Sequence, residues 1–372
     1  MNIEPSPSSL LVNLSILMDQ PTGISVYIQN LLPFIHSLDP VLFSAKPISG
    51  FRCQSIPQGL SPAFGNQGHL KRLCWLQQKI PNYYRQLGHQ SSNQSGRSLI
   101  FSPSPEAPIW SGCRFVVMAH DTIPLRFPQT FSPYLVGYFR YYVGRVLAQA
   151  EHVICNSVST ANDVKKFYGV PTPKITPIPL AYDQQNFRPG DQPLGNYFLY
   201  VGRQAPYKNL YRLVAAFHQV CATNHNLELW LVGPQDQRYT PALKAKIASL
   251  GIESQVRFLD YVAYEQLPVL LRGALALTLP SLWEGFGLPV LEAMACGTPV
   301  ITSNLSSLPE VAGDAAILVD PYNTDDIANA MKMVAKDADL RAQLSIAGLA
   351  QAQKFSWQKT GEQTADVIRK FL

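Results

Sequence analysis

Apolar runs bounded by glycine and proline alternate along this chain with stretches in which apolar residues recur every three or four positions. The runs at residues 114–119, 197–201 and 274–279 are typical of strands buried on both faces of a sheet. The spacing over residues 24–38 and 209–222 predicts helices that bury one face. This alternation predicts an α/β protein built from doubly wound parallel sheets.

Other stretches have a less regular pattern. Residues 49–68 and 91–96 are rich in Gly, Pro, Ser, Asn and Gln, and we expect loops there. Residues 70–87 mix bases with Leu, Trp and Tyr, which predicts a basic amphipathic helix broken at Pro81. Such a helix either packs one face on its own domain or lies on a membrane surface. Residues 134–150 predict an aromatic helix.

At 372 residues the chain is longer than one core usually serves, so we expect two domains. Prolines and glycines are densest over residues 171–196, and we place a linker at 186–196. Residues 1–185 then form the first domain and residues 197–355 the second. Residues 356–372 predict a last amphipathic helix, which we expect to pack back on the first domain.

Charge is distributed unevenly between the two halves. Residues 1–190 carry 15 Lys and Arg against 8 Asp and Glu, whereas residues 191–372 carry 15 against 17. Residues 51–100 contain six bases and no acid. This bias fits an anionic membrane surface or a phosphorylated acceptor as a partner, and solubility or chance would explain it equally well.

Composition excludes several protein classes. A hydrophobic content of 47% with 15% charged residues is typical of a globular chain and not of a disordered one. No apolar run reaches the roughly 18 residues that span a bilayer, and no basic region precedes the apolar residues 10–17, so we expect no signal peptide. The six cysteines show no metal-binding spacing and fit reduced residues of an intracellular protein.

The most informative stretch runs over residues 274–302. After its strand comes a tight glycine-containing loop, then a short helix that we expect to open at Pro289 and to end at Gly297. A helix N-terminus offers unpaired N–H groups and a partial positive charge, so it can hold an anion. Glu284 and Glu292 flank it and can accept hydrogen bonds from hydroxyls. A phosphate cradle between two hydroxyl-binding carboxylates indicates a nucleotide sugar.

Two further segments lie where ligands of parallel sheets bind, after the carboxyl end of a strand. His120 follows the strand at 114–119 and can donate hydrogen bonds or stabilise charge, although a lone His is often structural. Gly23 ends the turn after the first strand and permits close backbone approach, which an ordinary βα turn also requires. The one Asp-x-Asp sequence, at residues 337–339, lies among helical residues near bases and reads as a solvated face.

With these pieces placed, the second half resembles family 4 of the retaining glycosyltransferases, whose GT-B fold has two Rossmann-like domains facing a cleft. The likeness in the first half is thinner. Within the family the motifs are similar to those of bacterial mannosyltransferases that use GDP-mannose, although UDP-sugar enzymes share much of them. The matching motifs are VGRQAPYK at 201–208, PSLWEGFGLPVLE at 280–292, GTPV at 297–300, SLPEVAGDAAILVDP at 307–321, and in the first half PTGI at 21–24, HDTIPL at 120–125 and CNSVS at 155–159.

The resemblance implies a role for each matching residue. Arg203 and Lys208 would hold the donor diphosphate and neutralise it as it leaves. Glu284 would hold the transferred sugar beneath the reacting carbon, and His120 would contact that sugar from the other domain. The remaining donor contacts would come from Gly23 to the diphosphate, Glu292 to the ribose hydroxyls, Tyr261 and Val262 to the base, and the backbone of Gly285, Phe286, Gly287 and Leu288.

The chain departs from the family pattern at two places. In the first loop Ser25 and Val26 replace a common Gly and Arg, which removes a possible phosphate ligand. Asp260 stands where Gly is common. Neither change touches Arg203 or Lys208.

The expected reaction is transfer of a hexose with retention by a front-face route, in which the leaving diphosphate oxygen takes the proton of the acceptor. Arg203, Lys208 and a helix N-terminus would already neutralise the diphosphate, so we expect no cofactor and no metal. GDP-mannose is favoured over UDP-glucose as the donor. The acceptor would be a glycan or a lipid-linked glycan, and nucleic acid is not expected as a partner.

The location expected is the cytoplasm, with peripheral attachment to the inner face of the membrane as an option. Two other functions remain open: a nucleotide-sugar 2-epimerase on the same fold, and a non-catalytic nucleotide-sugar-binding partner of another transferase. Hydrolysis by the two carboxylates is not favoured, because Glu292 is assigned to the nucleotide. A pyridoxal-phosphate-dependent phosphorylase is not favoured either, because no Lys stands in a distinguishing motif.

Overall fold

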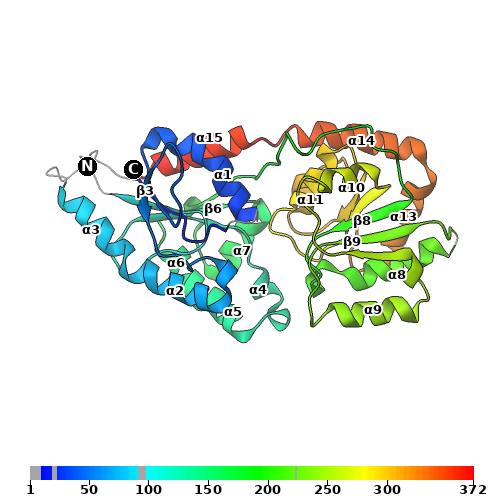
Figure 1. Ribbon diagram of the computed structural model, residues 1–372, viewed down its shortest axis with the longest axis horizontal. Helices are drawn as coiled ribbons and strands as arrows, with labels where there is room; N and C mark the ends of the chain where they lie inside the picture. The colour runs from blue at the N-terminus through cyan, green and yellow to red at the C-terminus, as the bar shows by residue number, and fades with distance from the viewer. Residues whose placement is uncertain (1–9, 19–22, 91–97, 223) are drawn as a thin grey trace. The chain divides into compact units, whose positions relative to one another are not determined.

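The computed structural model describes residues 10–18, 23–90, 98–222 and 224–372, which form two compact units. Unit 1 contains the described residues up to Leu180 together with Trp357–Leu372. Unit 2 contains Ala181–Ser356, and it therefore includes residues 186–196 (Figure 1). The polar loop expected at residues 91–96 lies outside the described residues.

Unit 1 is built on a seven-stranded sheet whose strands are all parallel. The spatial order is β3-β2-β1-β4-β5-β6-β7, so the connections reverse direction between β1 and β4. Most strands are buried on both faces, as their continuous apolar sequences predict. The strands are β1 (Leu10–Asn13), β2 (Val41–Ser44), β3 (Arg52–Ser55), β4 (Leu99–Ser102), β5 (Phe115–Ala119), β6 (His152–Cys155) and β7 (Ile175–Pro177).

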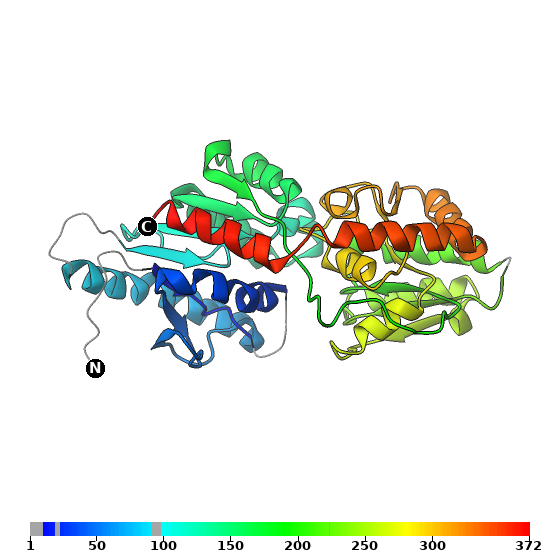
Figure 2. The ribbon, with the colours of Figure 1, turned by 90° about the horizontal axis from the view of Figure 1, so that it is seen from above.

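Helices cover both faces of this sheet (Figure 1). One face carries α1 (Gly23–Ile35) and the C-terminal helix α15 (Trp357–Arg369), which run side by side (Figures 1 and 2). The other face carries α2, α3 and α6, whose apolar side chains join one core cluster with the strands. The remaining bounds in unit 1 are α2 (Gly65–Gln78), α3 (Ile80–Gln90), α4 (Ile123–Arg126), α5 (Pro133–Gly137), the π-helix η4 (Tyr138–Val143), α6 (Gly144–Gln149) and α7 (Val158–Tyr168).

Helix α15 packs closely on α1 because a glycine faces that helix. A Cβ placed on Gly361 would lie 2.1 Å from the ring of Phe34 in α1, so no larger residue fits without a shift. Tyr27 of α1 contacts the ring of Trp357 at 6.4 Å, and its hydroxyl lies 3.4 Å from Thr364. The last helix is therefore part of unit 1, although the whole of unit 2 precedes it in the sequence.

One expectation for unit 1 needs correction, and two others are confirmed with a difference in detail. Residues 49–68 are not only loop, because they contain β3 and the start of α2. Strand β3 was missed because it forms the sheet edge, where its side chains are only half-buried and no apolar run is needed. The aromatic helix expected at 134–150 is confirmed, and its middle, η4, is a π-helical segment that joins α5 to α6. The break near Pro81 is confirmed, and it falls at Lys79.

Unit 2 has a six-stranded parallel sheet of order β10-β9-β8-β11-β12-β13. Its connections reverse direction between β8 and β11. Helices α8 and α9 cover one face, and α10, α11 and α14 cover the other (Figure 1). The strands are β8 (Tyr197–Val201), β9 (Glu228–Val232), β10 (Val256–Leu259), β11 (Ala276–Leu279), β12 (Val300–Ser303) and β13 (Ile317–Val319). The helices are α8 (Leu210–Cys221), α9 (Thr240–Ser249), α10 (Leu267–Gly273), α11 (Leu288–Ala295), α12 (Leu308–Ala312), α13 (Thr324–Lys336) and α14 (Ala338–Ala352).

The expected fold class is confirmed, because each unit is a doubly wound parallel sheet. In such sheets, ligands bind outside the carboxyl ends of the strands, at the point where the strand order reverses. In unit 2 that point lies between β8 and β11, and in unit 1 it lies between β1 and β4. These two places position the candidate site residues.

Candidate active site

The loops after β8 and β11 meet at the reversal point of unit 2, although they lie about 75 residues apart in the sequence. The backbone N–H of Leu282 donates to the carbonyl of Tyr207 at 2.8 Å. This bond places the segment that carries Lys208 beside the segment that carries Glu284. Residues predicted from two separate motifs are therefore brought into one site.

Lys208 and Glu284 form the centre of this site. The ammonium of Lys208 donates to both carboxylate oxygens of Glu284, at 2.6 and 2.7 Å. The side chains are 14% and 9% exposed, so the pair is largely shielded from water. The hydroxyl of Ser281 donates to Glu284 Oε1 at 2.7 Å. The carboxylate is thus oriented by three hydrogen bonds, and Ser281 is a contributor that the sequence motifs did not single out.

The backbone around Glu284 is held by two consecutive serines. The N–H of Glu284 donates to the hydroxyl of Ser306 at 3.1 Å. The hydroxyl of Ser307 donates to the carbonyls of Glu284 and Phe286, at 3.0 and 2.8 Å. Ser306 has a φ of 59°, a left-handed conformation that is uncommon for a residue with a side chain. The loop is fixed before any ligand arrives.

The backbone of Lys208 is fixed by its neighbour Asn209. Asn209 is 3% exposed and has a φ of 64°, a left-handed conformation that Asn tolerates better than most residues. Its side-chain amide donates to the carbonyl of Pro280 at 3.0 Å and to that of Pro321 at 2.6 Å. It thereby ties three loops at the carboxyl edge of the sheet together. Sequence reasoning missed Asn209, since its partners lie 71 and 112 residues away.

Arg203 lies at the same edge but does not contact Lys208 or Glu284 in this arrangement. Its side chain is 63% exposed, and its guanidinium forms an ion pair of 3.6 Å with Asp236, which follows β9. Asp236 is itself 7% exposed and also pairs with Arg238 at 3.4 Å. Hydrogen bonds from Arg238 are the largest cause that lowers the pKa of Asp236. A nearly buried carboxylate thus aims two exposed guanidinium groups outward.

The backbone beside Arg203 has room only for glycines. Gly233 has a φ of 129°, and a Cβ on it would lie 2.3 Å from the carbonyl oxygen of Gly202. Gly202 in turn donates to the carbonyl of Val232 at 2.9 Å. The turns after β8 and β9 therefore approach closely and leave an open edge above them.

Helix α11 begins at Leu288, one residue before the expected Pro289, and Gly287 precedes it with a φ of 109°. A Cβ on Gly287 would lie 2.9 Å from Leu308. At the other end Gly297 has a φ of 76°, which confirms the expected left-handed glycine. Gly285 is half-buried, whereas Phe286 is 5% exposed and packs its ring against Phe355, so its side chain belongs to the core.

Glu292 lies in the second turn of α11 and is half-buried. Burial raises its pKa to about 7, and the negative charge of Asp183 adds a smaller increase. Tyr264, which follows β10, has its pKa raised chiefly by burial and further by the charge of Glu292. The carboxyl of Glu292 is therefore near the segment after β10, and its burial favours the protonated form.

Tyr261 and Val262 also follow β10. The Tyr261 side chain is 74% exposed, and Val262 is half-buried. The adjoining Asp260 accepts a 2.6 Å hydrogen bond from Gln235, which follows β9. The ends of β9 and β10 are thus tied together, with Tyr261 open to solvent. Glycine at position 260 could not form this bond, so Asp260 has a structural use here.

In unit 1, His120 follows β5 and its imidazole is held by two contacts. Its Nε2 lies 2.8 Å from the carbonyl oxygen of Pro103, and the ring of Tyr27 meets it edge-on at 5.8 Å. Because a carbonyl only accepts, the Nε2 carries the proton and Nδ1 is the acceptor in the neutral ring. Burial lowers the pKa of His120 and outweighs the opposing effect of the Pro103 carbonyl. Gly23, exposed at the start of α1, lies one helical turn from Tyr27.

The segment after His120 is fastened by a buried carboxylate that the motif search did not include. Asp163 of α7 is 1% exposed. It accepts from the hydroxyl of Thr122 at 2.7 Å and from the guanidinium of Arg126, with Nε at 2.8 Å and Nη2 paired to the other oxygen. These bonds fix the turn that presents His120 and Asp121.

A cavity of about 550 Å³ opens at the carboxyl ends of β1, β2 and β3 in unit 1. Its lining is mostly apolar, with polar side chains at intervals. The apolar side includes Leu14, Leu17, Met18, Ile56, Leu60 and Phe64, and the polar side includes Ser15, Ser44, Lys46, Gln58 and Ser61. This cavity lies on the same edge of the sheet as His120, where a parallel sheet binds its ligands.

Within the described ranges of the chain, no group of three or more His, Cys, Asp and Glu could hold a metal ion. The Asp-x-Asp sequence has a structural role: Asp337 caps α14 by accepting a hydrogen bond from the N–H of Leu340 at 2.9 Å.

Comparison with known protein families identifies both halves of the chain. Residues 23–186 match the model described as "Glycosyltransferase Family 4", and residues 183–351 match "Glycosyl transferases group 1". The two matches meet near the boundary between units 1 and 2.

Curated relatives and solved structures agree with these matches. The O-antigen chain mannosyltransferase B of Escherichia coli is 30% identical over 69% of the chain, which spans 70% of that protein. The O-antigen chain mannosyltransferase RfbU of Salmonella typhimurium is 31% identical over 59% of the chain, which spans 60% of its length. The sucrose-phosphate synthase of Thermosynechococcus elongatus has a similar structure, with a TM-score of 0.75 and 20% identity over 98% of this chain and 99% of that one. This likeness confirms the expected GT-B fold.

Proposed function

The chain belongs to family 4 of the group 1 glycosyltransferases, and we propose that it transfers a hexose from a nucleotide sugar to a glycan or lipid-linked acceptor. Mannose is the favoured hexose. The observation that supports this most is the pairing of Lys208 with Glu284 at the reversal point of unit 2. A cation and a carboxylate held together at this edge are the two groups that a sugar diphosphate needs. The first binds phosphate and the second binds hydroxyls.

Arg203 and Lys208 bind the donor diphosphate in this proposal. Both are cations at the carboxyl edge of the sheet, and Asp236 aims the exposed guanidinium of Arg203 away from the core. Negative charge grows on the diphosphate as the sugar bond breaks. Fixed cations that face this charge lower the barrier, because they need no reorganisation during the reaction.

Glu284 accepts hydrogen bonds from the hydroxyls of the transferred sugar, and Glu292 accepts from those of the ribose. Tyr261, Val262 and the backbone of Gly285, Phe286, Gly287 and Leu288 complete the donor site. The supporting geometry is that Ser281 and Lys208 already orient Glu284, while Glu292 lies on α11 beside the segment after β10. From unit 1, His120 contacts the donor sugar through its neutral imidazole. Gly23 lets the backbone of the first loop approach the diphosphate closely.

The donor is GDP-mannose in preference to UDP-glucose. This choice is supported by the curated relatives, two of which are named mannosyltransferases of O-antigen chains. Transfer proceeds with retention by a front-face route, in which the leaving diphosphate oxygen takes the acceptor proton as the new glycosidic bond forms. Glu284 then positions the sugar and forms no bond to it.

The reaction needs no metal in this proposal. Arg203, Lys208 and the N-terminus of α11 supply positive charge to the diphosphate. The Asp-x-Asp sequence is not available as a metal site because Asp337 caps α14.

The acceptor binds in unit 1, and the cavity at the ends of β1, β2 and β3 supports an amphipathic acceptor. Its apolar lining suits a lipid or other apolar group, and its serines, Gln58 and Lys46 suit hydroxyls and an anionic group. We propose that the protein acts in the cytoplasm and attaches peripherally to the membrane. No helix in the described part of the chain is long and apolar enough to cross a bilayer.

A nucleotide-sugar 2-epimerase and a non-catalytic binding partner are the alternatives. One experiment separates them from the proposed function. The purified protein is incubated with GDP-mannose or UDP-glucose, with and without a lipid-linked glycan extract, and its products are identified. Transfer that requires the acceptor supports the proposal, whereas an epimer overturns it. Binding seen as a thermal shift, with no product from any donor, indicates the non-catalytic role.

A further inference from the structure

A second candidate binding surface lies on unit 1, on the outer side of α2, α3, η4 and α6. Large apolar side chains are exposed there: Trp110 at 74%, Tyr141 at 71% and Tyr134 at 50%. Scattered exposed apolar residues are normal, but a group of aromatic residues beside bases marks an interaction surface. We name this surface the basic aromatic face, and it comprises Lys71, Arg85, Trp110, Tyr134, Tyr141 and Arg145.

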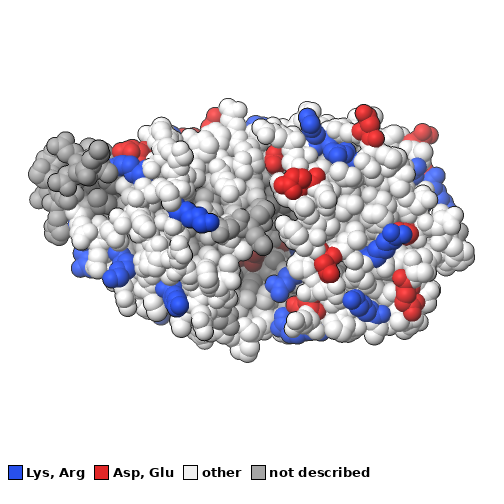
Figure 3. Space-filling model, in the orientation of Figure 1, with Lys and Arg blue, Asp and Glu red and all other residues white. Residues whose placement is uncertain are grey.

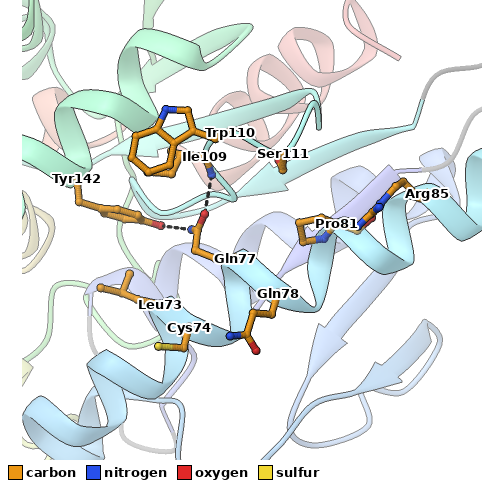
Figure 4. Close-up of a pocket in the computed structure, with 10 residues that line it drawn as sticks. All are labelled: Leu73, Cys74, Gln77, Gln78, Pro81, Arg85, Ile109, Trp110, Ser111 and Tyr142. Carbon is orange, nitrogen blue, oxygen red and sulfur yellow. Dashed lines mark hydrogen bonds between the residues drawn. The ribbon is translucent and has the colours of Figure 1, made fainter.

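Direct contacts join the loop at residues 109–110 to α2, η4 and α6 beneath this face. The guanidinium of Arg145 in α6 lies 5.6 Å above the ring of Trp110. Gln77 of α2 donates to the hydroxyl of Tyr142 in η4 at 3.2 Å and accepts from the N–H of Ile109 at 2.9 Å (Figure 4). The helices and the loop before β5 therefore form one continuous surface.

A groove of about 700 Å³ runs between α2–α3 and this loop. Figure 4 shows Trp110 on one side of the groove, Gln77 and Gln78 on the other, and Arg85 toward one end. Much of the lining is apolar, which suits an acyl or glycerol portion of a lipid better than a free ion. The apolar lining residues are Leu73, Pro81, Ile109, Trp110 and Tyr142.

The charge of this face has one sign. No Asp or Glu occurs at residues 40–105 or 122–150, the two stretches that hold its helices. Between them, Glu106 is 3% exposed and is bound by Arg72 at 2.6 Å, so it does not reach the surface. Asp121 follows β5 at the opposite, carboxyl edge of the sheet, and Glu151, next to the second stretch, is paired with Arg114 at 2.9 Å. In Figure 3 blue side chains appear without red ones over α2 and α3. The face is therefore complementary to an anionic surface and would repel a second copy of itself.

The backbone of Trp110 is held in an unusual conformation. Its φ is +54°, which is rare for an aromatic residue, and its N–H donates to the side chain of Gln149 at 3.1 Å. Such strain persists only where the surrounding structure imposes it, and it is concentrated at functional sites. Here it accompanies an indole that is turned to solvent.

We propose that the basic aromatic face binds peripherally to an anionic phospholipid bilayer, with Trp110 and Tyr141 at the level of the headgroups and Lys71, Arg85 and Arg145 on lipid phosphates. Aromatic side chains with bases and no acids are the combination that favours the membrane interface. This identifies the surface behind the peripheral attachment proposed above, and rests on that proposal for its purpose. The test of membrane binding needs neither donor nor transfer, so this proposal and the proposed function can fail separately.

The test measures binding of the full-length protein to vesicles of phosphatidylcholine, with and without phosphatidylglycerol, by co-sedimentation and tryptophan fluorescence. We expect binding only to the vesicles that contain phosphatidylglycerol, with a shift of the emission to shorter wavelength. Equal binding to neutral vesicles, or no binding to either, would overturn the proposal.

Variants locate the surface. The double substitution Lys71→Ser and Arg85→Ser should weaken partitioning by about five-fold for each charge removed. The control Lys244→Ser with Lys336→Ser removes the same charge from exposed positions of unit 2 and should change partitioning less than two-fold. An equal loss in both double variants would mean that net charge alone acts, and it would refute the assigned face.

Trp110→Gly provides a test that does not threaten the fold, because glycine accepts the positive φ without strain. We expect the wavelength shift to disappear and partitioning to fall, while the midpoint of thermal unfolding stays the same or rises. A full shift in this variant would place the contact elsewhere. Self-association of the wild type that Trp110→Gly abolishes, with no vesicle binding, would identify a second copy as the partner instead.

Discussion

The ammonium of Lys208 donates to both carboxylate oxygens of Glu284 and so joins the loop after β8 to the loop after β11. In the proposed function these groups bind different parts of the donor, the diphosphate and the sugar. Each is the partner of the other when no donor is present. When a sugar diphosphate binds here, the Lys208–Glu284 ion pair is replaced by contacts of Lys208 with the diphosphate and of Glu284 with the sugar. The loops after β8 and β11 are already ordered before binding.

Lys208→Met should reduce transfer about 100-fold or more, because a fixed cation facing the leaving diphosphate is lost. It should also lower the free energy of unfolding by about 2 kcal/mol, since the mostly buried Glu284 is left without its partner. Steady-state assays and urea denaturation measure the two effects.

A double variant separates these roles. Lys208→Met combined with Glu284→Gln removes both charges, and most of the lost stability should return while transfer stays low. If the double variant regained activity, neither residue would belong to the donor site.

Asp236→Asn should raise the donor KM several-fold with a smaller change in kcat, because Arg203 loses the carboxylate that orients it. Arg238→Gln is the matched control, since it leaves the Arg203–Asp236 pair in place. An equal rise in KM for the control would show that Arg238 itself contacts the donor.

Glu292→Gln should remove a pH dependence of stability. The pKa of Glu292 is raised from 4.5 in the reference state to about 7 in the fold, so the folded protein holds its proton more tightly than the unfolded chain does. The contribution of Glu292 to the free energy of unfolding therefore falls as pH rises from about 4.5 to about 7, by up to about 3 kcal/mol.

Because Gln is neutral at every pH, the Glu292→Gln variant should be more stable than the wild type at pH 8 and no more stable than the wild type at pH 4. Thermal unfolding at the two pH values measures the difference. A gain that is the same at both would contradict the raised pKa.

Gly361→Ala should lower the free energy of unfolding by about 1–3 kcal/mol, because the new Cβ meets the ring of Phe34. Combining it with Phe34→Leu should recover part of this loss, since the smaller side chain makes room. Wild-type stability of Gly361→Ala alone would mean that α15 can shift away from α1 at little cost.

Transfer in EDTA should equal transfer in buffer, because Arg203, Lys208 and the N-terminus of α11 supply the charge that a metal would. The assay compares initial rates with and without the chelator, and then with added Mg²⁺ or Mn²⁺. A loss in EDTA that the ions restore would refute the metal-free reaction.

The sequence predicted those parts of the fold whose signals are local. The runs before Glu284 and His120 form β11 and β5, since a strand buried on both faces needs a continuous apolar run. Gly297 ends α11 because few residues other than glycine accept its φ of 76°. Strand β3 was missed, since it lies at the sheet edge, where its side chains are not buried and no apolar run is needed.

Motifs named candidate residues but not the contacts between them. Glu284 and Lys208 were identified from separate motifs, and only the parallel neighbours β8 and β11 reveal that they touch. Asn209 was missed because its partners, Pro280 and Pro321, are distant in the sequence. Asp236 was missed because its pairing with Arg203 depends on how β8 and β9 align. The excess of basic residues in the first half could be read from the sequence. That these bases lie beside Trp110 depends on how α2, η4 and α6 pack.

The C-terminal position of α15 has a consequence for synthesis on the ribosome. Unit 2 is continuous, so it can fold as soon as it emerges, whereas α1 must wait for α15 until all of unit 2 has been made. At about 5–20 residues per second this delay is on the order of ten seconds. During that time the side of α1 that α15 will cover, including Tyr27, is open to solvent and to chaperones. The nascent chain is thus most prone to aggregate through unit 1, because unit 1 is synthesised first but lacks α15 until synthesis ends.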